Sequence, residues 1–375
     1  MSFSDIVGHQ GTIRLLKRAV LSRRVPHAYL FVGPSNVGKT LVATELAKAL
    51  NCEEVTDPQS VDDIEPCDRC SACTRIQKGT HPDFRLVYPT AHLKAEEIDE
   101  LVAMAGAEIR IEQIRDLIES VALKVNQARR RVYIITEADA MNQHAENAFL
   151  KTLEEPAGAT TIILTTSSPA SLLPTIVSRC QVVNFHPVPA DEACTYLSSR
   201  HPEADSADIH SIVAMSAGRL GWAQRLLQQP EVLQIRSDLL DLCARLPGAD
   251  WVECFQAGEA IVDLAERWWL ATTDEEIAER ALKASRDRVL RTSMYNILDI
   301  LATWFRDLLL LSSSPQADGL LNVDRGEQLR GLAGRYDVAK CEAASRHLQD
   351  MRGELGQNAN IRLATETLAL RLIVT

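Results

Sequence analysis

The sequence predicts an α/β domain built on a parallel sheet with a phosphate-binding loop, followed by two helical domains. Four short apolar runs, at 28–32, 132–135, 161–165 and 181–185, are rich in β-formers and nearly continuous. Such runs are typical of strands buried on both faces of a parallel sheet. Helical patterns lie between the runs, and this alternation favours right-handed crossovers. No strand-like run follows Phe185, so the remaining chain is expected to be helical.

Length, charge and the absence of a long apolar run argue against some classes of protein. The chain has 375 residues, 24% of them charged, and a formal net charge of −11 at pH 7. This acidic balance argues against nonspecific coating of nucleic acid, which needs a basic face, but it allows local phosphate contacts. No apolar run reaches the roughly 18 residues of a membrane helix, and the N-terminus does not resemble a signal peptide. We therefore expect a cytoplasmic protein without a membrane partner.

Changes in pattern along the chain predict three domains. The first is expected at residues 1–186, and it contains a cysteine-rich module at about 50–80. His186-Pro187-Val188-Pro189 resembles a linker, because prolines resist continuing a helix or a strand. A small helical domain is expected at 187–243 and a larger one at 244–375. The larger domain carries an apolar stripe at helical spacing, formed by Leu290, Met294, Ile297, Leu298, Leu301, Trp304, Phe305 and Leu308.

The strongest motif is a phosphate-binding loop. Gly33-Pro34-Ser35-Asn36-Val37-Gly38-Lys39-Thr40 matches G-x-x-x-x-G-K-[ST], with a predicted strand before it and a predicted helix after it. Backbone N–H groups of such a loop surround phosphate, and the positive end of the helix adds to the attraction. Lys39 is expected to reach the β- and γ-phosphates and Thr40 to hold Mg²⁺. The expected nucleotide-binding residues are Gly33, Asn36, Val37, Gly38, Lys39 and Thr40.

The second motif of a nucleotide-hydrolysing site is incomplete. After the run 132–135, Thr136 stands where such an enzyme carries the aspartate that helps to hold Mg²⁺. Glu137 remains as the candidate for polarising water, and Asp139 is a substitute only through a shifted turn. Because threonine cannot supply an anionic oxygen, both Mg²⁺ retention and hydrolysis are expected to suffer. We therefore expect a loop that binds ATP or ADP without efficient turnover.

A cluster of cysteines predicts a structural metal site. Three thiols have C-x-x-C-x-x-C spacing, and a fourth lies fifteen residues upstream of them. Four thiolates make a closed tetrahedral Zn²⁺ site, which can fix the polar segment 53–66. An iron–sulfur cluster or metal-free thiols are the alternatives, and His81 is expected to be a surface or turn residue. The expected ligands are Cys52, Cys67, Cys70 and Cys73.

Several motifs together resemble the clamp-loader branch of the AAA+ family. The resemblance covers residues 1 to about 228, whereas the last third is similar only in its helical character. It also implies that Val7 lies in the nucleotide site. Besides the phosphate loop and the cysteines, the motifs are Asp5-Ile6-Val7-Gly8-His9, His27-Ala28-Tyr29-Leu30-Phe31, His81-Pro82-Asp83, Ile111-Glu112-Gln113-Ile114-Arg115, Asn147-Ala148-Phe149-Leu150-Lys151-Thr152-Leu153-Glu154-Glu155-Pro156 and Ser178-Arg179-Cys180.

The resemblance implies an architecture, partners and a role for one arginine. The fold would be an AAA+ domain with an embedded zinc module, then a helical lid domain and an all-α collar domain for oligomerisation. Arg179 would be an arginine finger acting in a neighbour's ATP site, although spacing alone favours a salt-bridged arginine. The partners would be gamma/tau and delta subunits in a heteropentameric ring, a sliding clamp, and primed DNA through the assembled complex during DNA replication.

Within this family, the residues favour a stationary subunit over an ATP-hydrolysing motor. Thr136 replaces the magnesium aspartate, and Gly221 stands where motor subunits carry an arginine that senses the γ-phosphate. The sequence also ends after one collar domain. The intact phosphate loop keeps the motor alternative open, and a zinc-containing DNA-binding protein is the other alternative. The acidic insertion at 91–108 receives no role.

Overall fold

The computed structural model describes residues 2–89, 108–122, 126–154, 156, 158–273, 275–357 and 359–374. The insertion at 91–108 therefore lies outside the described residues except for its last one, Glu108. Among the described residues, one unit contains those up to Tyr196 together with Gly218–Gly221. The other contains Leu197–Ala217 and the residues from Trp222 onward. No helix in the described part of the chain is long and apolar enough to cross a membrane.

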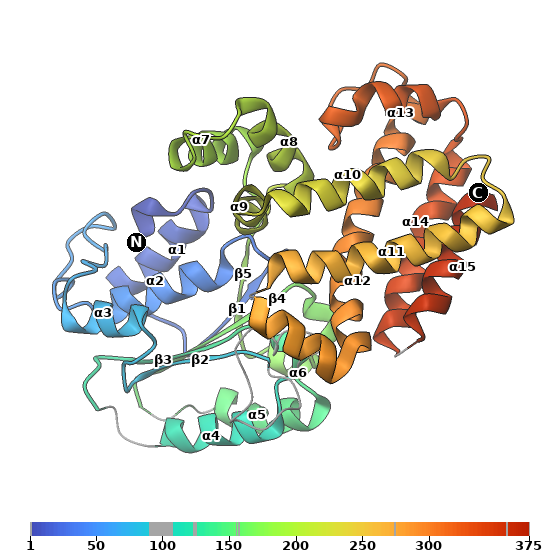
Figure 1. Ribbon diagram of the computed structural model, residues 1–375. Coiled ribbons are helices and arrows are strands. Elements are labelled where there is room, and N and C mark those ends of the chain that lie inside the picture. Colours follow the sequence, from blue (N-terminus) through green and yellow to red (C-terminus); the bar gives the residue numbers. More distant parts are fainter. Residues whose placement is uncertain are drawn as a thin grey trace. The chain divides into compact units, whose positions relative to one another are not determined.

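Within the described residues, the first unit is built on a five-stranded parallel sheet (Figure 1). The strand order is β2-β3-β4-β1-β5, so β4 lies between β1 and β3. The carboxyl ends of these three central strands therefore lie side by side at one edge of the sheet. The strands are β1 (Ala28–Val32), β2 (Phe84–Val87), β3 (Arg131–Ile135), β4 (Thr160–Thr166) and β5 (Gln181–Asn184).

The sequence pattern predicted four of these strands and missed β2. Phe84 and Val87 are buried, whereas Arg85 and Leu86 between them are exposed. β2 lies at the edge of the sheet and pairs only with β3 among the described strands. An edge strand is buried less completely than a central one, so it lacks the continuous apolar run that reveals the others.

Helices cover both faces of the sheet, with α1 and α2 on one side and α4 and α5 on the other (Figure 1). The two cores alternate along the strands: Phe31 and Ile134 belong to the core under α1 and α2, and Leu30 belongs to the core over α4 and α5. The main elements of this unit are α1 (Gln10–Leu21), α2 (Lys39–Asn51), α4 (Ile111–Ala122) and α5 (Gln143–Glu154). The short ones are η1 (Phe3–Asp5), α3 (Ser71–Gln77), η3 (Ala138–Ala140), η4 (Pro169–Ser171) and α6 (Pro174–Val177).

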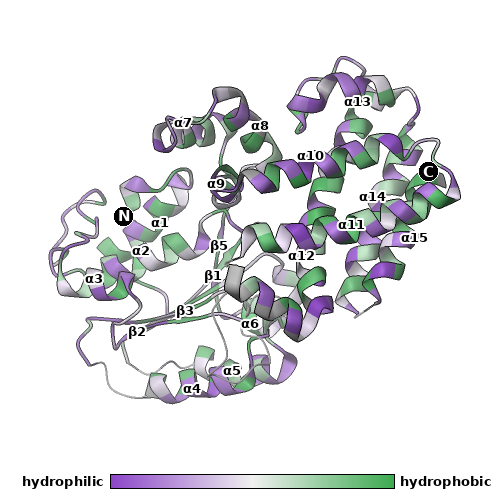
Figure 2. Ribbon diagram, in the orientation of Figure 1, coloured by the Kyte–Doolittle hydropathy of each residue, from purple (hydrophilic) through white to green (hydrophobic). Residues whose placement is uncertain are grey.

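The described residues after the linker are helical, as the sequence predicted. The apolar stripe is buried on α12, and this helix ends at Ser313, two residues before Pro315. Figure 2 shows hydrophobic and hydrophilic residues alternating around α10 and α11, as expected of amphipathic helices. The elements are α7 (Ala190–Arg200), α8 (Ser206–Ser216), α9 (Leu220–Gln228), α10 (Pro230–Arg245), α11 (Trp251–Thr272), α12 (Glu275–Ser313), η5 (Val323–Arg325), α13 (Gly326–Ala333), α14 (Val338–Gly356) and α15 (Ile361–Val374).

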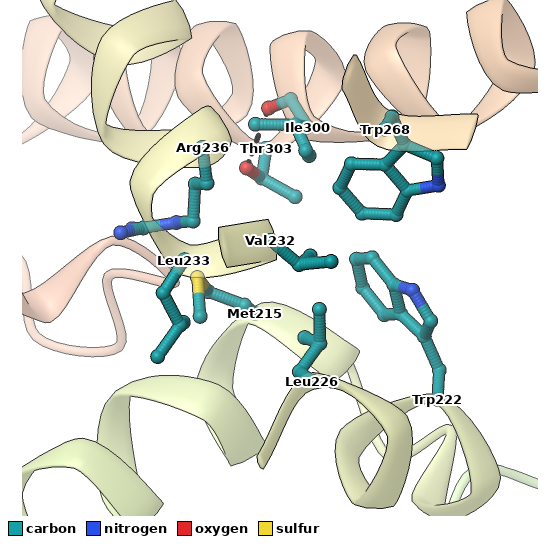
Figure 3. A pocket seen from close by; sticks show the side chains of 9 residues that line it. All are labelled: Met215, Trp222, Leu226, Val232, Leu233, Arg236, Trp268, Ile300 and Thr303. Carbon is teal, nitrogen blue, oxygen red and sulfur yellow. Dashed lines mark hydrogen bonds between the residues drawn. The ribbon is translucent and has the colours of Figure 1, made fainter. Parts of the chain in front are cut away.

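Four tryptophans of the helical unit belong to its core, whereas Trp251 at the start of α11 is exposed. Trp268, Trp269 and Trp304 are buried. Trp222 and Trp268 flank one end of a small hollow whose volume is about 10 Å³ (Figure 3). Such a space holds about one water molecule, so these indoles fill a core and do not form a cofactor site.

Candidate nucleotide site and metal centre

The phosphate loop lies between the carboxyl end of β1 and the first turn of α2. Gly33 lies so close to Phe185 that an added Cβ would stand 2.4 Å from the carbonyl oxygen of that residue. Gly38 precedes α2 with a φ of 106°, in the left-handed region that favours glycine. Each glycine of the motif is therefore required by the backbone, for a different reason.

Lys39 is folded into the loop. Its Nζ donates hydrogen bonds to the carbonyl oxygens of Gly33 and Pro34, at 2.6 and 2.8 Å. Burial lowers the pKa of Lys39, while the nearby carboxylates of Asp139 and Glu137 oppose this shift. Thr40 follows in the first turn of α2 and is half-buried. Lys39 and Thr40 thus lie next to each other at the start of α2, directly after the loop.

Hydrogen bonds from distant segments hold the loop backbone, and the sequence did not reveal the donors His9 and Gly221. The Nε2 of His9 lies 2.8 Å from the carbonyl oxygen of Val37. The backbone N–H of Gly221 donates to the carbonyl oxygen of Asn36 at 3.0 Å. Val7, which the sequence assigned to the nucleotide site, is half-buried two residues before His9.

The position of the missing aspartate is occupied by a threonine whose hydroxyl is already engaged. The backbone N–H and the Oγ1 of Thr136 both donate to the carbonyl oxygen of Val87, at 2.9 and 3.3 Å. The hydroxyl therefore bonds to the neighbouring edge strand β2. This geometry leaves the carboxyl end of β3 without an anionic metal ligand at position 136.

Two carboxylates follow at the same edge of the sheet. Burial raises the pKa of Glu137, and Asp139 raises it further, while Lys39 opposes the change. The Oδ2 of Asp139 accepts a long hydrogen bond of 3.5 Å from the hydroxyl of Ser167, and its Oδ1 is buried without a hydrogen-bond partner. Asp139 therefore lies close enough to Glu137 and Lys39 to shift the pKa of both, whereas the sequence offered it only as a substitute through a shifted turn.

Arg179 lies two residues after α6 and is held in place by its neighbours. Its Nε donates to Glu154 Oε1 at 3.0 Å, its Nη2 forms an ion pair with the same carboxylate, and its Nη1 donates to the carbonyl oxygen of Thr175 at 3.0 Å. The side chain is 34% exposed. The structure thus contains the salt-bridged arginine that spacing alone predicted, with part of the guanidinium open to solvent.

The four predicted metal ligands come together. The sulfur atoms of Cys52, Cys67, Cys70 and Cys73 all lie within 4.8 Å of one another. Thiolates bound to one tetrahedral Zn²⁺ at about 2.3 Å would lie roughly 3.8 Å apart, so the cluster fits the ion. Backbone N–H groups also donate to three of the sulfurs, at 3.3 to 3.4 Å. Burial alone would raise the pKa of Cys70, but the N–H of Cys73 helps to hold it below its usual value.

The cysteine module, residues 52–77, is attached to α2 by a buried cation. The Nζ of Lys48 lies 2.7 Å from a carboxylate oxygen of Glu45 and 2.8 Å from one of Asp68. The side chains of Lys48 and Glu45 are fully buried. Val55 and Ile64 of the module are buried in the core under α1 and α2. The segment 53–66 therefore contributes to the sheet core, which its polar composition did not predict.

His81 and Asp83 support the strand that leads away from the module. His81 is buried, which corrects the surface position expected for it, and its Nδ1 accepts a hydrogen bond from the N–H of Asp83 at 3.1 Å. The carboxylate of Asp83 accepts from three consecutive backbone N–H groups, at Asn126, Gln127 and Ala128. Burial alone would raise the pKa of Asp83, but these donors together with Arg131 hold it at about 2.

Asp83→Asn is expected to lower the free energy of unfolding by about 2 kcal/mol at pH 7. The folded-state pKa of about 2 lies below the ordinary value of 3.8, so the folded protein binds fewer protons than the unfolded chain. The contribution of Asp83 is therefore complete above pH 4 and is lost as the pH falls towards 2. Urea unfolding of wild type and Asp83→Asn at pH 7 and pH 3 measures this effect. The exposed Asp116 provides the control Asp116→Asn, and an equal loss for both variants would contradict the assignment.

Comparison with known proteins assigns the first unit. Residues 8–189 match a family model described as the delta subunit of DNA polymerase III. Over these residues, the chain is similar to the clamp-loader subunits of DNA polymerase III. The parallel sheet with its phosphate loop is the α/β domain that the sequence pattern predicted.

The proteins similar to this chain include more than one kind of DNA polymerase III subunit. The delta' subunits of Pseudomonas aeruginosa and Bacillus subtilis are 35% and 37% identical, over 53% and 47% of this chain. The tau subunit of Bacillus subtilis is 29% identical over 88% of the chain. These matches span about half of each relative, at 55%, 47% and 54% of its length. A solved Thermotoga maritima gamma subunit-related protein, 18% identical over 96% of this chain and 98% of its own, has a TM-score of 0.41 and adds nothing to the assignment.

Proposed function

We propose that this chain is the delta-prime subunit of a bacterial clamp loader. In this role it is a stationary member of the ring, binds ATP or ADP at its phosphate loop, and turns nucleotide over poorly. The observation that carries the proposal is Thr136, because its hydroxyl bonds to Val87 and no carboxylate replaces it at that position. Hydrolysis in this class of ATPase needs Mg²⁺ held against the phosphates, and one of its anionic ligands is absent.

The catalytic contribution of the subunit would be made in a neighbour's site. Arg179 is partly exposed and its guanidinium is oriented by Glu154 and Thr175. An arginine presented in this way can stabilise the charge that develops on a transferring phosphoryl group. The partners of the proposed role are gamma/tau and delta subunits in a heteropentameric ring, the sliding clamp, and primed DNA reached through the ring.

We also propose that the four-cysteine cluster holds one structural Zn²⁺. A bound zinc ion would tie the end of α2 at Cys52 to the segment that carries the other three thiols. Four protein ligands leave no open coordination position, so the ion would supply stability and no reaction chemistry. Arg129 supports the same segment, because its guanidinium donates to the carbonyl oxygens of Cys52 and Val55.

An ATP-hydrolysing motor subunit is the second candidate function. The phosphate loop is intact, and the tau subunit of Bacillus subtilis matches a larger share of this chain than the delta' subunits do. Glu137 and Asp139 provide two carboxylates near Lys39, and either could contribute to a catalytic site. The two candidates differ in one measurable property, which is turnover by the isolated chain.

Nucleotide binding and steady-state hydrolysis by the purified chain with Mg²⁺ test the proposal. We expect binding of a fluorescent ADP or ATP, loss of binding in Lys39→Ala, and no turnover above background. The exposed Lys78 provides the control Lys78→Ala, which should bind like wild type. Hydrolysis that disappears in Lys39→Ala but persists in Lys78→Ala would reassign the chain as a motor subunit.

A further inference from the structure

A polar cavity lies between the cysteine module and the segment that precedes β3. Its volume is about 310 Å³, far more than one water molecule needs. The end of α2, the module with α3, and residues 127–129 line it, and all of these segments belong to the first unit. A cavity of this size accepts a small ligand, and the side chains that line it decide which kind.

Two arginines make the cavity positive. Arg75 lies on α3 and Arg129 lies two residues before β3, so two separate segments supply the charges. The Nη1 of Arg75 donates a hydrogen bond of 2.7 Å to the Oε1 of Gln127, which holds this guanidinium at the cavity. Glu53 also lines the cavity, and its Oε1 accepts a long hydrogen bond of 3.4 Å from the N–H of Ala72. Among the described residues that line the cavity, the two guanidinium groups therefore outnumber the one carboxylate.

A buried histidine adds a hydrogen-bond donor to the cavity. His81 is only 6% exposed, and it is one of the residues that line the cavity. Its Nδ1 accepts the N–H of Asp83, so the proton of the neutral ring is on Nε2. Burial lowers the pKa of His81, Asp83 opposes this shift, and Arg75 lowers the pKa further, so the ring is neutral at pH 7. The ring can therefore donate through Nε2 beside the guanidinium of Arg75.

The amide side chains of the cavity already use their acceptor oxygens within the protein. The Oδ1 of Asn51 accepts from the backbone N–H of Arg130 at 3.0 Å, and the Oε1 of Gln127 accepts from Arg75. Donors are more plentiful, because a guanidinium carries five N–H groups and the hydroxyl of Ser71 also lines the cavity. A surplus of donors and positive charge favours a ligand that offers anionic acceptor oxygens.

We propose that this cavity binds the phosphate group of a small ligand. The donors belong to α3 and to the segment that leads into β2, so they can approach a ligand from different directions. A tetrahedral phosphate accepts hydrogen bonds from several directions, whereas a planar carboxylate pairs best with one guanidinium in its own plane. A bound phosphate would join Arg75 of the module to His81. The cavity shares no lining residue with the phosphate loop, so this site is independent of nucleotide binding there.

Hydrogen–deuterium exchange of the full chain, titrated with inorganic phosphate, tests the site. Lys39→Ala serves as the background, so that phosphate bound at the phosphate loop does not contribute. Millimolar phosphate should slow exchange in the peptides that cover 71–81 and 126–131, relative to chloride at the same ionic strength. Glycerol 3-phosphate is the second probe: stronger protection by this ester would support a phosphorylated small molecule as the ligand, and stronger protection by inorganic phosphate would support the free ion.

Substitutions in the same background show which side chains hold the phosphate. Arg75→Gln should weaken phosphate binding roughly tenfold or more, because a charge-assisted hydrogen bond is lost, and Arg75→Lys should lose less. Ser71→Ala removes one exposed donor and should weaken binding about threefold. Arg69→Gln is the matched control, because Arg69 carries the same charge in the same module, is 78% exposed and does not line the cavity.

Thermal melting without phosphate must first show that each variant is folded. Phosphate that leaves exchange over 71–81 unchanged would overturn the proposal, as would equal protection by acetate. Affinities that are the same in Arg75→Gln, Ser71→Ala and Arg69→Gln would also overturn it, because the cavity would then not hold the anion.

Discussion

Arg179→Ala is expected to slow ATP hydrolysis by roughly 10³-fold or more at the one neighbouring site that receives this side chain in a reconstituted clamp loader. A guanidinium that contacts the transferring phosphoryl group stabilises charge that alanine leaves uncompensated. The change should leave folding nearly intact, because the ion pair between Arg179 and Glu154 is partly exposed and such pairs contribute little to stability. Single-turnover hydrolysis by the purified complex measures the effect.

Three controls make the Arg179 result specific. Size-exclusion chromatography must show that the variant still assembles. Arg23→Ala removes an arginine whose side chain is 80% exposed and that has no proposed role, so turnover should be unchanged. Glu154→Gln weakens the ion pair but keeps the arginine, so it should cost much less activity than Arg179→Ala. Wild-type single-turnover rates in an assembled Arg179→Ala complex would rule out the finger.

Cys70→Ser is expected to reduce bound zinc from one equivalent to none and to lower thermal stability. Structural zinc contributes about 10–16 kcal/mol of apparent binding free energy in small zinc domains at pH 7. In this protein part of the module is also held by Val55 and Ile64, so the loss should be largest around residues 52–77. Metal analysis of the purified protein and the melting temperature measure the two effects.

The control for the zinc prediction is another cysteine of the same chain. Cys194 lies on α7, outside the cluster, and its thiol is half-buried. Cys194→Ser should therefore keep one equivalent of zinc and a melting temperature close to that of wild type. Iron in place of zinc, or wild-type protein without stoichiometric metal, would show that the cluster has been assigned to the wrong ion or to no ion.

The sequence predicted those features whose signals are local. The phosphate loop is one continuous segment between a strand and a helix, and the three thiols of 67–73 have a ligand spacing, so both could be recognised without coordinates. Strand β2 was missed because its exposed middle gives no apolar run. Lys48 was missed because a lysine on an amphipathic pattern is ordinarily exposed. Only the fold places Asp68 beside it.

Contacts between distant segments of the candidate site could not be predicted. His9 and Val37 are 28 positions apart in the chain, and Gly221 reaches Asn36 from beyond β5. The sequence indicated Gly221 only as a missing arginine, because family resemblance describes side chains and this contact is made by backbone. The sequence singled out Thr136 as a change of chemistry, but its bond to Val87 depends on β2, the strand that the pattern missed.

The fully buried Lys48 has a consequence for engineering. Exchanging the module for a shorter loop, or transplanting it onto another phosphate-loop domain, would separate Lys48 from Asp68, one of its two carboxylate partners at 2.8 Å or less. Removing one partner of a buried ion pair costs about 3–5 kcal/mol, whereas replacing the whole group by apolar residues can be neutral. A viable chimera should therefore change positions 45 and 48 together with the module. The segment that can be transplanted therefore includes the second half of α2 as well as the residues that carry the cysteines.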